Sequence, residues 1–230
     1  MGSVLRMGPS ARAEGQVAEG GVPAPVRDLV LCVDGSAPER VAAYVERELP
    51  PGGIPAYRAA RGGGVRSFVL WADEHRRERL ATLVTVSAGN GVSTYQVLGA
   101  HGEPIGTFVR EKALRGRGLR TRWTVTPAGG PEAVGFKGRI FWWYVWWLFL
   151  PIQTLIIVLS LLGGSGDAAR GPRRIVWRAG RRAALEFTSK DDSVRLHAPG
   201  YDWRLGVALM ALLRTFDSWL LGTEWDDRKE

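Results

Sequence analysis

The sequence predicts an α+β protein built mainly from antiparallel β-strands, arranged as a barrel or meander around an apolar C-terminal helix. Short runs with strand-like alternation recur from residue 80 onward, which is typical of antiparallel sheets joined by tight turns. One apolar helical run follows them, and one long uncharged run interrupts them. Of the 230 residues, 45% are hydrophobic and 23% are charged, so a sizeable core is available and a chain disordered throughout is excluded.

The N-terminal part is expected to contain a leader followed by a small module. Residues 1–27 are rich in Gly, Ala, Pro and Glu and lack the apolar run of a signal peptide, so we expect them to be disordered. Residues 28–79 are expected to form an α/β module of strand, helix and strand. Its elements are the strand Asp28–Val33, a helix from the Ser-Ala-Pro-Glu capping box of residues 36–39 to Leu49, a loop at Arg61–Gly64, and the strand Val65–Trp71.

Residues 80–222 are expected to form the main β domain, followed by a polar tail over residues 223–230. The predicted strands alternate between apolar and polar residues and are separated by turn residues such as Gly and Pro. They are Leu80–Val86, Ser93–Leu98, Ile105–Arg110, Thr121–Thr126, Ala133–Phe136, Arg174–Arg178, Ala183–Thr188 and Ser193–His197. The run Leu205–Leu221 is apolar around nearly its whole circumference, which predicts a helix buried inside a protein or a membrane.

The run Phe141–Leu162 predicts attachment to a membrane. It contains no charged residue, and as a continuous helix it would be about 33 Å long, comparable with a hydrocarbon core of about 30 Å. Thirteen of its residues are Leu, Ile, Val or Phe, and its tryptophan cluster suits the membrane–water interface. The residues expected to insert are Phe141, Trp142, Trp143, Trp146, Trp147, Leu150, Pro151, Ile156 and Leu159.

The charges around this run favour a topology that returns to the side from which it left. Pro151 interrupts the run near its middle, so the run is either a kinked span or a re-entrant hairpin. Both flanks are basic, and a hairpin or a second span keeps both on the cytoplasmic side, as the positive-inside rule requires. We expect the flanking cations to bind lipid headgroups: Lys137, Arg139, Arg170, Arg173, Arg174, Arg178, Arg181 and Arg182.

One stretch of the β domain resembles a known family. A Tyr-x-Val strand, a Gly turn, an Ile-Gly-x-Phe strand and a Trp-x-Val strand follow one another at Tyr95, Val97, Gly102, Ile105, Gly106, Phe108, Trp123 and Val125. This pattern resembles the hairpin repeat of LURP-one-related proteins, which share their fold with the tubby C-terminal domain and phospholipid scramblases. The resemblance covers residues 80–222. It implies a closed barrel threaded by a hydrophobic C-terminal helix, and binding to anionic phospholipid at the cytoplasmic face.

This chain departs from that family in the position of its apolar segment. Phe141–Leu162 is inserted between the two halves of the expected barrel, whereas scramblase-like relatives carry their apolar segment at the C-terminus. The resemblance therefore does not imply scramblase activity for this chain. A single membrane span would also separate the two halves of the barrel, whereas a re-entrant hairpin would leave them on one side.

The sequence offers little support for catalysis or for metal binding. Its one cysteine, Cys32, excludes an intramolecular disulfide and a Cys-rich zinc site. The three histidines are scattered, and no nucleophile motif is present. We therefore expect no enzymatic activity, no metal and no cofactor. The net charge of +8 indicates a polyanionic partner, but the tryptophan cluster is not interleaved with basic residues, so nucleic-acid binding is not expected.

These observations predict a non-catalytic protein of the cell membrane, with most of the chain on the cytoplasmic side and a β domain that binds anionic phospholipid. The alternative is an integral membrane protein with two spans, residues 141–162 and 205–221, and no barrel. The identity of the lipid and the oligomeric state stay open at this stage.

Overall fold

The computed structural model describes residues 3–9, 24–33, 38–113, 120–137, 174–189, 191–198 and 200–216. Within these ranges it contains twelve strands and two helices. The strands are β1 (Val4–Pro9), β2 (Asp28–Val33), β3 (Arg40–Arg47), β4 (Phe68–Trp71), β5 (Arg79–Gly89), β6 (Val92–Gly99), β7 (Pro104–Glu111), β8 (Arg122–Pro127), β9 (Ala133–Phe136), β10 (Arg174–Ala179), β11 (Arg182–Thr188) and β12 (Ser193–Leu196). The helices are α1 (Gly53–Gly62) and α4 (Trp203–Arg214).

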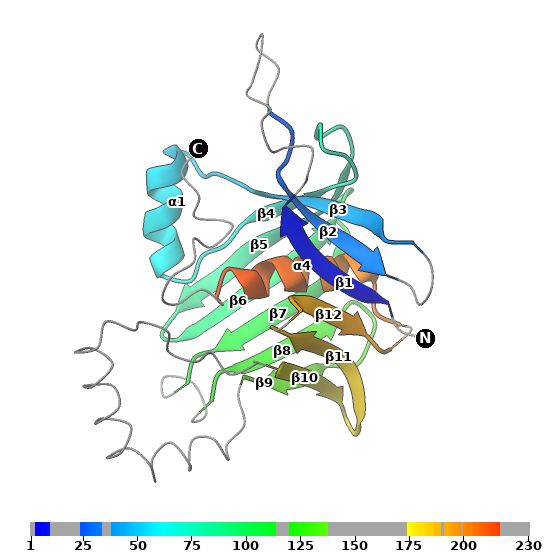
Figure 1. The fold of residues 1–230 in the computed structure, drawn as a ribbon. Helices are drawn as coiled ribbons and strands as arrows, with labels where there is room; N and C mark the ends of the chain where they lie inside the picture. Colours follow the sequence, from blue (N-terminus) through cyan, green and yellow to red (C-terminus); the bar gives the residue numbers. More distant parts are fainter. Residues whose placement is uncertain are drawn as a thin grey trace, which may run out of the picture.

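All twelve strands form one closed antiparallel barrel in which each strand pairs with its neighbours in the sequence (Figure 1). The ring is closed by β1, which pairs with β12 from Val4↔Arg195 to Arg6↔Ser193. Because all pairs are antiparallel, successive connections alternate between the two ends of the barrel. We call the end that carries the β1–β2, β3–β4, β5–β6, β7–β8, β9–β10 and β11–β12 connections the β9–β10 end, and the other the β8–β9 end.

Helix α4 lies inside the ring of strands (Figure 1), and its nine consecutive residues Leu205–Leu213 are all buried. The helix begins where the Asp202 side chain accepts a hydrogen bond from the Arg204 backbone N–H, at 2.8 Å. A helix that is apolar on all sides is stable only where other apolar side chains surround it, as they do inside the barrel. The predicted buried helix is thus confirmed over its described part. The alternative of two spans without a barrel disagrees with this placement, because the barrel surrounds the second of those spans.

The strands predicted from residue 80 onward are all present, each within three residues of its predicted ends. Their inward side chains alternate with outward ones and include Trp123, Trp177, Tyr95 and Phe108, which are almost completely buried. The predicted barrel and its C-terminal helix are therefore confirmed.

The N-terminal predictions require correction. Residues 40–47, expected to be helical, form strand β3, which fills the gap between β2 and β4 and directs Ala43 and Val45 inward. Pairing on both sides outweighs the local capping signal at residues 36–39. Residues 4–9, expected to be disordered, form β1, because Leu5 and Met7 alternate on the core side and close the ring. The strand–helix–strand module is wrong in its helix, and its strands belong to the barrel.

The helix of the N-terminal part lies later in the chain than the sequence pattern predicts. Helix α1 occupies Gly53–Gly62, on the connection between β3 and β4, and stands outside the ring of strands (Figure 1). The sequence pattern predicts a helix that ends at Leu49 and a loop at Arg61–Gly64. Gly52, with φ of 99°, instead makes the left-handed turn that leads into the helix.

The apolar run Phe141–Leu162, predicted to be an inserted membrane hairpin, lies outside the described residues, as does the tail over residues 223–230. In the part of the chain that the structure describes, no helix combines the length and the apolar character needed to cross a membrane.

Two glycines allow the helix to approach the wall of the barrel. A Cβ at Gly106 on β7 would lie 2.7 Å from the Thr126 carbonyl oxygen and 2.9 Å from Leu205 Cδ1. A Cβ at Gly206 would lie 2.8 Å from Leu5 Cδ1. The backbone oxygen of Thr126 is fixed by the sheet, so the contact at Gly106 is the less adaptable of the two.

We expect Gly106→Ala to lower the free energy of unfolding by about 1–3 kcal/mol, the usual cost of overpacking a filled core. The measurement is chemical denaturation of the full chain in mild detergent. Gly89→Ala is the matched control, because a Cβ on that strand glycine has no heavy atom within 4 Å. Equal stability of the two variants would contradict the close approach of α4 to β7.

Candidate functional site

Of the eight residues predicted to bind headgroups, the structure describes five and divides them between the two ends of the barrel. Arg139, Arg170 and Arg173 lie outside the described residues, as do all nine residues predicted to insert into the membrane. Lys137 and Arg174 lie at the β9–β10 end, directly after β9 and at the start of β10. Arg178 lies near the other end of β10, and Arg181 and Arg182 lie at the β10–β11 turn of the β8–β9 end. At about 3.3 Å per residue, roughly 20 Å of strand separates Arg174 from that turn.

Arg174 already has a partner. Its Nε donates a hydrogen bond of 2.6 Å to Oε1 of Glu186 on β11, and His197 Nε2 lies 3.5 Å from the other carboxylate oxygen. The hydrogen bond from Arg174 is the main reason that the pKa of the Glu186 carboxyl lies below its ordinary value. Arg174 therefore contributes to the stability of the β10–β11 pair as well as to the charge of this end.

Four arginines surround the interior of the barrel at the β9–β10 end, and we call them the arginine mouth: Arg47, Arg66, Arg110 and Arg214. Arg47 and Arg110 occupy inward register positions, two residues beyond the buried Val45 and Phe108. Arg66 is only 3% exposed, just before β4. Arg214 ends α4, and its Nη1 donates to the Met7 carbonyl oxygen at 3.1 Å and to Asp192 Oδ2 at 3.0 Å.

Arg66 holds the C-terminal end of α4. Its Nε donates to Thr215 Oγ1 at 3.0 Å, and Thr215 Oγ1 in turn donates to the Leu212 carbonyl oxygen at 2.8 Å. Nη1 of Arg66 donates to the carbonyl oxygens of Arg61 and Val65. A cation suits this position, because the C-terminal end of a helix carries partial negative charge.

Phe216 lies against two guanidinium groups of the arginine mouth. Cζ of Arg66 is 4.6 Å from the centre of its ring, and Cζ of Arg110 is 4.1 Å from it. The ring also meets Trp123 edge-on at 5.8 Å. These cation–π contacts offset part of the cost of bringing the two charges into the mouth. Burial nevertheless lowers the pKa of the Arg110 guanidinium from its ordinary value.

Exposed apolar side chains gather at the same end. Among the described residues, six large hydrophobic side chains are exposed, and Leu49, Val65, Val86 and Phe136 lie toward the β9–β10 end. The other two are Val41 and Trp203. Cζ of Arg120 lies 4.6 Å from the centre of the Phe136 ring, so a cationic group lies against one of these apolar side chains.

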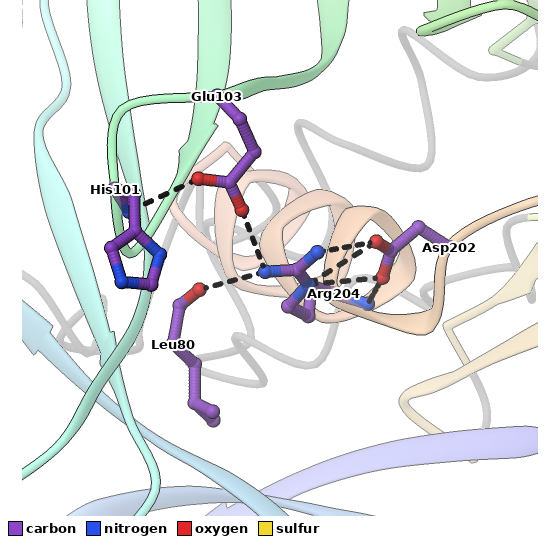
Figure 2. Close-up of polar contacts among 5 residues, drawn as sticks. All are labelled: Leu80, His101, Glu103, Asp202 and Arg204. Atoms are coloured by element: carbon purple, nitrogen blue, oxygen red, sulfur yellow. Dashed lines mark hydrogen bonds and ion pairs between the residues drawn. The ribbon is translucent and has the colours of Figure 1, made fainter.

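One cluster at the β8–β9 end pairs its charges within itself. Figure 2 shows Arg204 between Asp202 and Glu103, with its Nη1 also donating to the Leu80 carbonyl oxygen at 3.2 Å. Glu103 accepts a further hydrogen bond from the His101 backbone N–H. An open pocket of about 900 Å³ lies beside this network and is lined in part by His197, Tyr201 and Trp203. Here one guanidinium meets two carboxylates, so the cluster carries no excess positive charge.

The sequence pattern identified Arg110 only as the last residue of the predicted strand Ile105–Arg110 and did not single out Arg66. The alternation of Phe108 and Arg110 along β7 was the signal that Arg110 faces inward. Arg66 lies between α1 and β4, where no periodic pattern predicts its direction. The four exposed hydrophobic residues come from the β3–β4 connection, from β5 and from β9, so only the fold shows that they share one end of the barrel.

Scans of family models, of curated proteins and of solved structures gave no match to this chain. The structure agrees with the LURP-one-like prediction at the level of architecture, through a closed antiparallel barrel around an apolar helix. In the described ranges, no cluster of three or more His, Cys, Asp or Glu side chains is arranged to hold a metal ion.

The Glu186–Arg174 pair predicts a pH dependence of stability. A carboxyl whose pKa is lowered by folding stabilises the protein above its unfolded pKa of about 4.3, and this contribution is lost as the pH falls through the folded value. Between pH 6 and pH 3, the wild type should therefore lose more unfolding free energy than Glu186→Gln in denaturant titrations. Arg174→Gln should flatten the profile in the same way. Parallel profiles for all three proteins would contradict the pairing.

Proposed function

We propose that this chain is a non-catalytic protein of the cell membrane whose barrel contacts anionic phospholipid through its β9–β10 end. One observation carries the proposal. Strands β9 and β10 are antiparallel neighbours, with Val134 opposite Arg178, so Lys137 and Arg174 lie at the same end of the barrel. The connection that contains the apolar run Phe141–Leu162 therefore leaves from this end and returns to it.

This arrangement favours a re-entrant segment over a single span. A single span would place its two flanks on opposite sides of the bilayer, whereas adjacent barrel strands require both flanks on one side. Both flanks are also rich in basic residues, and the positive-inside rule favours the cytoplasmic side for such flanks. We accordingly propose that the barrel lies on the cytoplasmic face of the membrane.

The surface of the β9–β10 end supports contact with lipid headgroups. Cations near an anionic leaflet contribute about 1 kcal/mol each to binding, and exposed apolar side chains add to this by entering the interface. The partly exposed arginines of the mouth, Arg47, Arg110 and Arg214, together with Leu49, Val65, Val86 and Phe136, combine both features. Since α4 occupies the interior of the barrel, the proposed contact is with the end of the barrel and not with a lipid carried inside it.

The proposal predicts the orientation of the barrel on a membrane. In a Cys32→Ser background, single cysteines replace Phe136 at the β9–β10 end and Trp203 at the opposite end, both 41% exposed in the wild type. Each full-length variant carries a fluorescent label and is reconstituted into vesicles that contain nitroxide-labelled lipids. We expect strong quenching at position 136 and little at position 203, with stronger quenching when phosphatidylglycerol replaces phosphatidylcholine.

Two results would overturn this proposal. Equal quenching at both positions would mean that the β9–β10 end does not face the bilayer. Quenching at position 136 that does not depend on anionic lipid or on salt would leave the apolar segment as the sole membrane contact and would contradict headgroup binding.

A further inference from the structure

We propose that Arg110 is an anion-binding residue, and that the arginine mouth takes up one phosphate-type oxyanion against the edge of its guanidinium group. The inference deepens the proposed function by naming a residue for headgroup recognition, and it rests on that function only for the claim that the anion belongs to a lipid. The argument comes from the position of Arg110, from its partners and from the groups around it.

The position of Arg110 is set by the register of three strands. Arg110 lies opposite Ser93 on β6 and opposite Trp123 on β8, and both of these side chains are buried on the inner face. Its neighbour Glu111 points to the other face of the sheet, where its carboxylate lies 3.7 Å from Arg122 Nη1. The acidic residue next in the sequence is therefore not the counter-ion of Arg110.

The partners of Arg110 leave its hydrogen-bonding edge unused. Its Cζ lies 4.1 Å from the centre of the Phe216 ring and 5.8 Å from the centre of the Trp123 ring. Its buried Nε has no hydrogen-bond acceptor within the described residues. A guanidinium stacked on a ring keeps its N–H groups in its own plane, where they form a fork that matches the oxygens of phosphate.

Arg110 differs from three other arginines of the described residues in its hydrogen-bond acceptors. Arg66 donates to a hydroxyl and two carbonyl oxygens, Arg214 to a carbonyl oxygen and a carboxylate, and Arg204 to two carboxylates. Within the same part of the chain, no carboxylate forms an ion pair with Arg110, whose pKa is lowered by burial. A largely buried cation without an acceptor is costly, and a bound oxyanion would supply the missing charge and acceptors.

The surroundings indicate where the anion comes from. The arginine mouth lies at the end that carries four of the exposed hydrophobic residues and both flanks of the apolar run. A phosphate group that reaches Arg110 while its acyl chains stay in the bilayer fits this arrangement. Inorganic phosphate presents the same oxygens without a membrane, so the two sources share one chemistry and are separated by experiment.

The test compares Arg110→Met with Arg79→Met in the full chain. Arg79 is the matched control, because its Cζ also lies over an aromatic ring, 5.5 Å from the centre of Trp71. Arg79 differs from Arg110 in its position, since it is the first residue of β5, at the β8–β9 end. Thermal unfolding in nonionic detergent is followed against inorganic phosphate, with ionic strength held constant by chloride. Binding to phosphatidic acid vesicles is then measured with and without competing phosphate.

We expect phosphate to stabilise the wild type and Arg79→Met. The affinity of Arg110→Met for phosphate should be lower than that of the wild type by about tenfold or more. Without any anion, Arg110→Met should be as stable as the wild type or more stable, because an apolar side chain replaces a desolvated charge. Competition between phosphate and phosphatidic acid vesicles would identify the lipid headgroup as the source of the anion.

Other results separate the two proposals. If phosphate stabilises the wild type through Arg110 but anionic vesicles do not bind, the anion site stands and the proposed lipid function fails. If Arg110→Met and Arg79→Met respond equally to phosphate, the anion site is overturned. An Arg110→Met protein that is destabilised without anion and keeps the full phosphate response would show that Arg110 serves only to pack against Phe216.

Discussion

The pairing of β1 with β12 is the constraint on which the rest of the structure depends. These short strands join the beginning of the described chain to its last strand, through Val4↔Arg195 to Arg6↔Ser193. With that pair formed, the sheet has no free edge and encloses α4 on all sides. The antiparallel pairing around the ring also fixes which connections share an end. The arginine mouth, four of the exposed hydrophobic residues and both flanks of the apolar run lie at one end for this reason.

The parts of the fold that the sequence predicts are those with a strong local pattern. The strands from residue 80 onward alternate clearly, and the apolar run from Leu205 predicts a helix that is buried on all sides, in a protein or in a membrane. The errors arise where long-range pairing decides the structure. Residues 40–47 begin after a capping box yet become a strand between β2 and β4. Residues 4–9 offer only a short alternation, with Leu5 and Met7 facing inward, and their pairing with β2 and β12 makes them a strand.

The candidate site was less predictable, because it depends on which residues share an end of the barrel. Sequence proximity grouped Arg174 with Arg181 and Arg182, although a strand separates them in space. The mouth instead combines Arg66, Arg110 and Arg214 from distant parts of the chain. For Arg110 the alternation along β7 contained the information, whereas the positions of Arg66 and Phe216 depend on how α4 ends inside the barrel.

The closure between the first and last strands also has a consequence for the order of events during synthesis. Val4 and Arg195 are 191 residues apart in the sequence, so the ring closes only after β12 has left the ribosome. The apolar run emerges before β10, β11 and β12, when β1 and β9 are still edge strands with open hydrogen-bonding groups. Open edges of this kind make a partly synthesised chain prone to aggregation until the C-terminal strands pair with them.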